Sequence, residues 1–234
     1  MGISQHGHSS LPVPPDALRF RVSNSRDVKE FLDVGERCAN DLRTAINTIG
    51  RDIADCQAVL DFGCGSGRTL RWFVEKQPGF HGSDIDAEAI EWCKANLQGM
   101  TFSVNDSLPP LSIREPKFDL VYAISVFSHL NETYTRAWLA ELRRVTLPGG
   151  IVAISICGPL IYRATGMDVG DLHRNGLIFK QSDFWKDHFP AWYGDMYYDE
   201  IGARRIFSQD LDLVSYVPLG VNKHQDLLLL RKPP

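Results

Sequence analysis

A short apolar segment runs directly into a glycine-rich loop at Ala58-Val59-Leu60-Asp61-Phe62-Gly63-Cys64-Gly65-Ser66-Gly67. Four of the five residues before Gly63 are apolar, which is typical of a strand buried on both faces. Glycines have no Cβ, so the loop can turn tightly and leave room for a ligand beside the backbone. A helix expected over residues 68–76 would offer its unpaired N–H groups to that ligand. The stretch therefore predicts a buried strand, a ligand-binding loop and a helix.

The same alternation of strand and helix continues along the chain. Further strands are expected at 80–83, 101–104, 118–124 and 151–156, with helices over 87–97 and 131–145. Two more strands, at 211–217 and 227–230, are joined by a short turn and must be antiparallel, because a parallel crossover needs about a dozen residues. The sequence predicts an α/β fold of the doubly wound, Rossmann-like type: a mostly parallel seven-stranded sheet with an antiparallel edge strand and helices on both faces.

The chain is expected to form a single domain over residues 25–234, after a flexible lead-in at 1–24 that is rich in His, Ser and Pro. Within the domain, helical periodicity over 25–50 indicates a helix that could close over a ligand as a lid. Residues 56–157 form the strand–helix core, 158–208 an aromatic-rich insert, and 209–234 a C-terminal hairpin.

Composition argues against several classes of protein. The net charge is −4 and the sequence pI is about 6.0, whereas nucleic-acid binders usually carry a basic stripe. No apolar run approaches the roughly 18 residues of a membrane-spanning helix. The five cysteines form no Cys-x-x-Cys pair, so neither a disulfide framework nor a zinc site is indicated, and no metal is expected. A reducing, cytoplasmic location is the expectation.

The loop and a downstream acid together indicate the kind of ligand. Asp84 lies 21 residues after Gly63 at the end of the second strand, where a carboxylate suits the hydroxyls of a ribose. The dinucleotide-binding motif has a third glycine where this chain has Arg68. A phosphate-binding loop has Gly-Lys-Ser/Thr, whereas this chain has Gly67-Arg68-Thr69. A ligand with a ribose and no phosphate therefore fits best.

Five segments in order resemble class I S-adenosylmethionine-dependent methyltransferases, in particular uncharacterised bacterial members of the small-molecule type. The segments are 59–67, 82–86, 105–109, 118–121 and 139–154, so that the resemblance covers roughly residues 56–157. It implies S-adenosyl-L-methionine as the cofactor and a methyl acceptor as the substrate. The acceptor is expected to be a small molecule: the chain has Ala123-Ile124-Ser125-Val126 where enzymes that methylate nucleobases or glutamine have an Asn/Asp-Pro-Pro-aromatic motif, and it has no basic patch with interleaved aromatics.

The resemblance also implies roles for particular residues. The loop from Asp61 to Gly67 would surround the methionine part of the cofactor, Asp84 would hold the ribose, Ile85 would pack on the adenine, and Asp106 would accept from its amine. Ser125 would face the reaction centre, and Arg68 could pair with the carboxylate or be solvated. The cofactor-binding residues implied are Asp61, Phe62, Gly63, Cys64, Gly65, Gly67, Arg68, Asp84, Ile85, Asn105, Asp106, Ser107 and Ser125.

His129 is the first candidate for a catalytic base. It lies five residues after Ile124 in the loop that leaves the fourth strand, and a histidine of near-neutral pKa suits removal of a hydroxyl proton. The alternative is that Ser128-His129-Leu130 only caps the next helix or lines the pocket. His173, His188 and His224 are weaker candidates, and His224-Gln225-Asp226 could simply tie the hairpin together.

The aromatic residues of the insert have two interpretations, a roof over an acceptor cleft or a small satellite core. The acids Asp168, Asp171, Asp183 and Asp187 do not have the spacing of a metal site. For the whole chain the leading hypothesis is methyl transfer to a small molecule, at a hydroxyl oxygen before a nitrogen. The alternatives are an N-methyltransferase, a non-catalytic cofactor-binding or interaction protein of the same fold, and, more distantly, a nicotinamide oxidoreductase. The sequence leaves the oligomeric state open.

Overall fold

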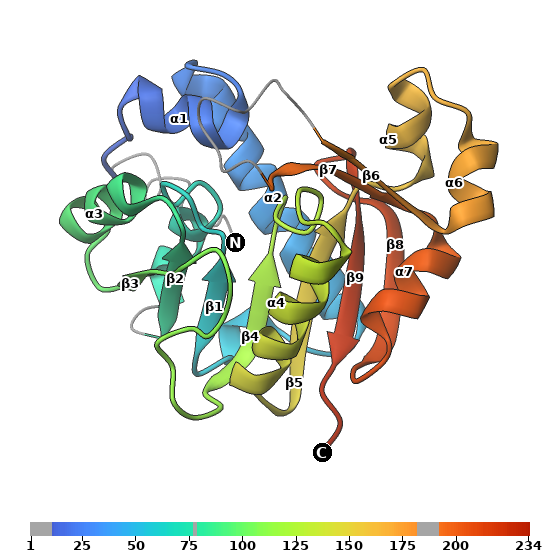
Figure 1. The fold of residues 1–234 in the computed structure, drawn as a ribbon. Coiled ribbons are helices and arrows are strands. Elements are labelled where there is room, and N and C mark those ends of the chain that lie inside the picture. The colour runs from blue at the N-terminus through green and yellow to red at the C-terminus, as the bar shows by residue number, and fades with distance from the viewer. Residues whose placement is uncertain (1–10, 77–78, 182–191) are drawn as a thin grey trace.

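A computed structural model describes residues 11–76, 79–181 and 192–234 and has a seven-stranded sheet at its centre (Figure 1). The strand order is β3-β2-β1-β4-β5-β9-β8. The strands are β1 (Val59–Phe62), β2 (Phe80–Asp84), β3 (Thr101–Val104), β4 (Phe118–Ala123), β5 (Thr146–Ile156), β8 (Asp212–Val221) and β9 (Gln225–Arg231). Strands β1 to β5 run parallel, and β9 runs antiparallel to both of its neighbours, β5 and β8. The predicted sheet is confirmed; the reversed strand is β9, with β8 outermost beside it.

Helices cover both faces of the sheet, and each face has its own apolar core. On one face lie α2 (Val28–Thr48), η3 (Leu70–Lys76) and α3 (Ala87–Asn96); on the other lie α4 (Glu132–Val145) and α7 (Glu200–Phe207) (Figure 1). Helix α2 shows why: Phe31, Cys38, Leu42 and Ile46 recur at helical spacing and are all buried. Burying one such large apolar side chain contributes roughly 1.5–3 kcal/mol, so the periodic stripe fixes which face of α2 meets the sheet.

The segment between β5 and β8 forms a second, smaller layer. It contains two short α-helices, α5 (Pro159–Ala164) and α6 (Val169–Asn175). A two-stranded antiparallel sheet of β6 (Leu177–Gln181) and β7 (Gly194–Tyr198) completes it. Strand β7 is bonded to the main domain through its backbone, because Met196 N–H donates to the Ser128 carbonyl (2.7 Å) and Tyr198 N–H to the Cys157 carbonyl (2.9 Å). The insert therefore lies against the carboxyl ends of β4 and β5.

Two local expectations differ from the structure. The helix predicted over 68–76 begins at Leu70 and is the tighter 3₁₀ type, because Trp72 N–H donates to the Thr69 carbonyl three residues earlier. Part of the predicted flexible lead-in is helix α1 (Asp16–Ser23), whose Leu18 is buried. The Arg71 guanidinium holds the chain before α1 by donating to the Leu11 carbonyl (2.9 Å) and to that of the following residue. These tertiary contacts order a segment whose composition alone suggests flexibility.

Among the residues that the structure describes, no helix is both long and apolar enough to cross a membrane.

Candidate functional site

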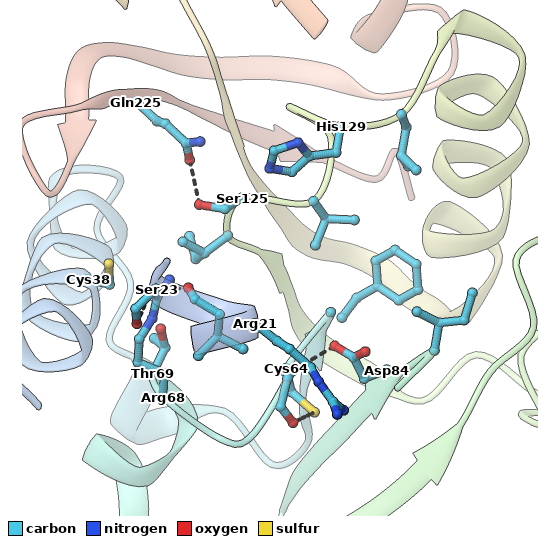
Figure 2. A pocket seen from close by; sticks show the side chains of 18 of the residues that line it. Arg21, Ser23, Cys38, Cys64, Arg68, Thr69, Asp84, Ser125, His129 and Gln225 are labelled. Carbon is cyan, nitrogen blue, oxygen red and sulfur yellow. Dashed lines mark hydrogen bonds between the residues drawn. The ribbon is translucent and has the colours of Figure 1, made fainter. Parts of the chain in front are cut away.

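A cavity of about 630 Å³ opens at the carboxyl ends of β1, β2 and β4, where ligands of open α/β sheets bind (Figure 2). Its volume lies within the usual range of small-molecule sites, about 300–1,000 Å³. The predicted residues that line it are Asp61, Phe62, Gly63, Cys64, Gly65, Arg68, Asp84, Ile85, Asn105, Asp106, Ser107, Ser125 and His129. Gly67 is the predicted residue that does not line the cavity. The structure thus brings the loop, the acid and the histidine together in one hollow.

The glycine loop is held in a backbone conformation that residues with a Cβ adopt at a cost. Gly63, Gly65 and Gly67 have φ angles of 78°, 51° and 74°. A Cβ on Gly63 would lie 2.2 Å from Val126 Cγ2, so the loop that follows β4 can close on β1 only with glycine there. A Cβ on Gly67 would lie 2.5 Å from Leu97 Cδ1, which gives Gly67 a packing role beneath the loop.

Asp84 at the end of β2 is fixed by two backbone donors. Its Oδ2 accepts from Gly65 N–H (2.6 Å) and its Oδ1 from Asp86 N–H (2.8 Å). Burial raises the pKa of the Asp84 carboxyl above its ordinary value, while these two hydrogen bonds act in the opposite direction. Each carboxylate oxygen can accept more than one hydrogen bond, so the anchored group still has lone pairs for the two hydroxyls of a ribose.

Asp61 lies deeper, on β1, and is only 3% exposed. Burial raises its pKa to about 8; a hydrogen bond from the Tyr122 hydroxyl (3.0 Å) lowers the pKa, and the nearby Asp84 charge raises it. The Asp61 carboxyl is therefore mostly protonated at neutral pH. A positively charged group placed beside it would favour the carboxylate form and expel the proton.

Arg68 joins the glycine loop to α1. Its Nη1 donates to the Val22 carbonyl and to Ser23 Oγ, whereas its Nε is buried and has no partner among the described residues. Burial lowers the pKa of Arg68. An unpartnered guanidinium N–H beside the loop suits a carboxylate ligand, which is the role that the sequence left open.

Helix α1 supplies a wall of the cavity that sequence reasoning missed. Arg21, Val22 and Ser23 line the cavity, and Arg21 forms ion pairs with Asp86 (2.8 Å) and Glu88 (2.7 Å) at the start of α3. Figure 2 shows Arg21 near Asp84 and Ser23 near Arg68. A usable signal was present in the sequence, because an acidic first turn and a basic last turn are typical of a short helix.

The loop after β3 forms the far end of the cavity. Asn105 accepts a hydrogen bond from Ser83 Oγ (2.7 Å) and donates to the Asp106 carbonyl (2.8 Å), which fixes the loop. The Ser107 carbonyl accepts from Trp138 Nε1 (3.0 Å). Asp106 and Ile85 are exposed at this wall. A planar ring could therefore lie on Ile85 with its polar edge towards Asp106.

His129 lies at the opposite end, and its tautomer is fixed by the insert. Its Nδ1 is 2.9 Å from the Gly194 carbonyl oxygen and 3.7 Å from Asp195 Oδ1, and its ring stacks on Tyr193 with centroids 4.4 Å apart. A carbonyl can only accept, so Nδ1 carries the proton and Nε2 carries the lone pair in the neutral ring. Burial lowers the pKa of His129, although the Gly194 carbonyl and the Asp195 charge act in the opposite direction. A neutral histidine with a free lone pair is what a proton acceptor requires.

The arrangement fits the group that the sequence implies. The unpartnered Nε of Arg68 suits a carboxylate, the protonated Asp61 suits an ammonium in exchange for its proton, and Asp84 suits a diol. These are the polar groups of S-adenosylmethionine. Residues 59–150 match the model of a family described as "Methyltransferase domain". Residues 59–150 carry a methyltransferase domain. Its cofactor is S-adenosylmethionine.

Three named relatives match part of this chain. Ribosomal protein L11 methyltransferase of Dechloromonas aromatica is 32% identical over 117 residues, 48% of this chain and 36% of that protein. Trans-aconitate 2-methyltransferase of Azoarcus sp. is 27% identical over 139 residues, 54% and 47% of the two chains. Methyltransferase GfsG of Streptomyces halstedii is 24% identical over 174 residues, 70% and 59% of the two chains. The chain thus spans between about a third and three fifths of the length of these relatives.

A solved structure shares the fold of the methyltransferase. The N-methyltransferase NodS of Bradyrhizobium japonicum WM9, in complex with S-adenosyl-L-homocysteine, superposes with a TM-score of 0.55 at 15% identity. The match covers 85% of this chain and 87% of that chain. The likeness in fold therefore extends beyond residues 59–150.

The aromatic residues of the insert divide between the two expected positions, the cavity wall and a core. Trp192, Tyr193 and Tyr197 line the cavity, whereas Tyr198 and Phe207 are buried in the main core. Tyr162 forms a satellite core with Leu172 and Tyr197, and Phe179 packs against the main core. The remaining aromatic residues of the insert, Phe184, Trp185 and Phe189, lie outside the described residues. The insert is therefore both a roof and a core.

The weaker histidine candidates of the methyltransferase have different surroundings. His173 is exposed and lies 3.2 Å from Asp199 Oδ2, away from the cavity; His188 lies outside the described residues. His224 lines the cavity, while Asp226 ties β8 to β9 by accepting from the Tyr216 hydroxyl.

The acids and cysteines give no metal site among the residues that the structure describes, where no group of three or more potential ligands is arranged to hold an ion. Asp168 caps α6 and Asp171 pairs with Arg174, whereas Asp183 and Asp187 lie outside the described part. Cys64 is buried at the cavity wall, and burial raises its pKa well above the ordinary value.

Proposed function

We propose that the protein transfers a methyl group from S-adenosylmethionine to a hydroxyl oxygen of a small-molecule acceptor, with His129 as the general base. The observation that supports this most directly is the hydrogen bond of His129 Nδ1 with the Gly194 carbonyl, which leaves the Nε2 lone pair at the cavity that also contains Asp84 and the glycine loop. A base and a cofactor cradle in one cavity are the parts that such a reaction needs.

When bound, S-adenosylmethionine supplies a methyl group on a positively charged sulfur, which departs as a neutral thioether as the acceptor oxygen takes the methyl carbon. The chain's own contribution is mainly alignment, which can be equivalent to an effective concentration on the order of 10⁵–10⁸ M. Asp84 would hold the ribose, Arg68 the methionine carboxylate and Asp61 its ammonium. These anchors would aim the methyl group at the end of β4, where Ser125 and His129 lie.

His129 would accept the hydroxyl proton at Nε2 as the carbon–oxygen bond forms. The resulting imidazolium keeps its Nδ1–H on the Gly194 carbonyl and lies 3.7 Å from Asp195 Oδ1, so a carboxylate stands near the new positive charge. Tyr193 covers one face of the ring by stacking on it. The three residues 193–195 therefore hold the base in place from the insert.

The acceptor would enter beneath the insert. Trp192, Tyr193 and Tyr197 give this end an aromatic lining, which suits an apolar or cyclic molecule. Trans-aconitate 2-methyltransferase, whose name denotes a small-molecule substrate, also supports a small acceptor. Ribosomal protein L11 methyltransferase, the relative named for a protein substrate, makes a protein the alternative acceptor to be tested.

The test is turnover of S-adenosylmethionine to S-adenosylhomocysteine with a library of hydroxyl and amine compounds and with purified ribosomal protein. The expected result is turnover with hydroxyl compounds, lost about 100-fold or more in His129→Ala, with the affinity for S-adenosylhomocysteine within about twofold. His173→Gln is the matched control, because His173 is exposed and outside the cavity. Turnover with amines or protein alone would refute the hydroxyl acceptor, and unchanged turnover in His129→Ala would refute the base.

A further inference from the structure

A buried glutamine joins three parts of the chain behind the methyl-transfer end of the cavity. Gln225, the first residue of β9, is 6% exposed, and its side-chain Oε1 lies 2.7 Å from Ser155 Oγ and 3.0 Å from Ser125 Oγ. Its Nε2 lies 3.3 Å from Ser128 Oγ. Ser125 follows β4, Ser155 belongs to β5, and Ser128 immediately precedes His129. The amide therefore connects Ser125 with the residue that precedes His129.

The distances fix which way the amide faces. The Ser155 hydroxyl accepts from Ser125 N–H (2.8 Å) and is fully buried, so its own proton needs an acceptor inside the protein. The separation of 2.7 Å is typical of an O–H donor, whereas an N–H donor is usually 2.9–3.0 Å away. Oε1 therefore faces Ser155 and Ser125, and Nε2 faces Ser128. The reversed amide would leave the Ser155 proton unsatisfied.

This orientation determines what the cavity offers to a substrate. The Ser125 hydroxyl must donate its proton to Gln225 Oε1, so only its lone pairs remain for the cavity. His129 Nε2 also presents a lone pair. Figure 2 shows Ser125, Gln225 and His129 on the same side of the cavity. The two groups nearest the expected reaction centre are thus both hydrogen-bond acceptors.

We propose that Gln225 sets the hydrogen-bond polarity of the methyl-transfer end, so that the group to be methylated must approach as a donor. This rests on the proposed function and narrows its substrate class. A hydroxyl or an N–H-bearing amine meets Ser125 and His129 favourably. A carboxylate, a carbonyl or a tertiary amine without a proton would bring its lone pairs against theirs. Gln225 is a positioning residue here, because it acts through the Ser125 hydroxyl.

The test compares two cofactor analogues and needs no acceptor. S-adenosylhomocysteine has nothing at the position of the transferred methyl, whereas sinefungin has a primary amine there, protonated at pH 7. Calorimetry with the full chain should show sinefungin binding about tenfold or more tightly, the range expected for one hydrogen bond to a charged donor. Gln225→Met, which keeps the length of the side chain and removes its hydrogen bonds, should lose most of that preference. Gln225→Glu still accepts from both serines and should keep it.

Ser125→Ala provides a second measurement, since it removes the proposed acceptor and leaves Gln225 in place. This variant too should lose the preference for sinefungin. If a thermal melt shows that Gln225→Met does not fold, Ser125→Ala serves alone. Equal binding of the two analogues by the wild type, or a preference unchanged in whichever of Gln225→Met and Ser125→Ala folds, would overturn the inference and leave the proposed function standing. Failure of the wild type to bind either analogue would overturn both.

Discussion

The Asp61 carboxyl should release its proton when the cofactor binds. With a pKa of about 8, roughly nine-tenths of Asp61 is protonated at pH 7 in the free protein. An ammonium placed beside it stabilises the carboxylate and lowers this pKa, so binding of S-adenosylhomocysteine should release up to ~0.9 proton at pH 7. The sign follows directly: a group that loses a proton on binding makes the ligand bind more tightly as pH rises towards 8.

Calorimetry at pH 7 in buffers of different ionisation enthalpy measures this number, because the observed heat varies linearly with protons released. Asp61→Asn has the same shape and no proton to lose, so its slope should be lower by about the same ~0.9 proton. Tyr122→Phe should act in the opposite sense: it removes the hydrogen bond that lowers the Asp61 pKa, so more proton is released at pH 8 than in the wild type. Equal slopes for the wild type and Asp61→Asn would refute the assignment of Asp61 to the ammonium.

Three further outcomes are expected. Asp84→Ala should weaken binding of S-adenosylhomocysteine by about 1–3 kcal/mol, because two hydroxyls lose their acceptor; an unchanged dissociation constant in calorimetry would remove Asp84 from the site. Gly67→Ala should lower the melting temperature more than Gly166→Ala. Both glycines have φ near 75–80°, but only at Gly67 does the new Cβ clash with a neighbour, Leu97. Equal melting temperatures of the two variants would contradict this. Turnover should rise with pH through a midpoint below the ordinary histidine pKa of about 6.5, because burial lowers the pKa of His129 and the base must be neutral. A midpoint that persists in His129→Gln would show that the titrating group is another residue.

The parts of the site predicted from the sequence are those fixed by local rules. The loop from Gly63 to Gly67 follows a buried strand, and the acid at position 84 ends the next one, so parallel pairing of β1 with β2 must bring them to one edge. His129 was found by the same rule, since it follows β4 in the loop at that edge. Such positions follow from strand order alone.

The parts that the sequence did not predict depend on contacts between distant segments. Helix α1 is ordered by Arg68 and Arg71, which lie some 45 to 60 residues away. Gln225 reaches Ser155 and Ser125 only because β9 pairs antiparallel with β5, and a sequence pattern does not predict that contact. The 3₁₀ geometry of η3 likewise does not follow from helical periodicity.

The bond between His129 Nδ1 and the Gly194 carbonyl has an evolutionary consequence. The insert that lines this end of the cavity also fixes which imidazole nitrogen of His129 carries the proton. A graft of residues 158–208 from another enzyme onto this scaffold would exchange both properties in one step. Under the proposed function, substrate range and proton chemistry would then change together, while the residues proposed to hold the nucleoside, at the other end of the cavity, would stay the same.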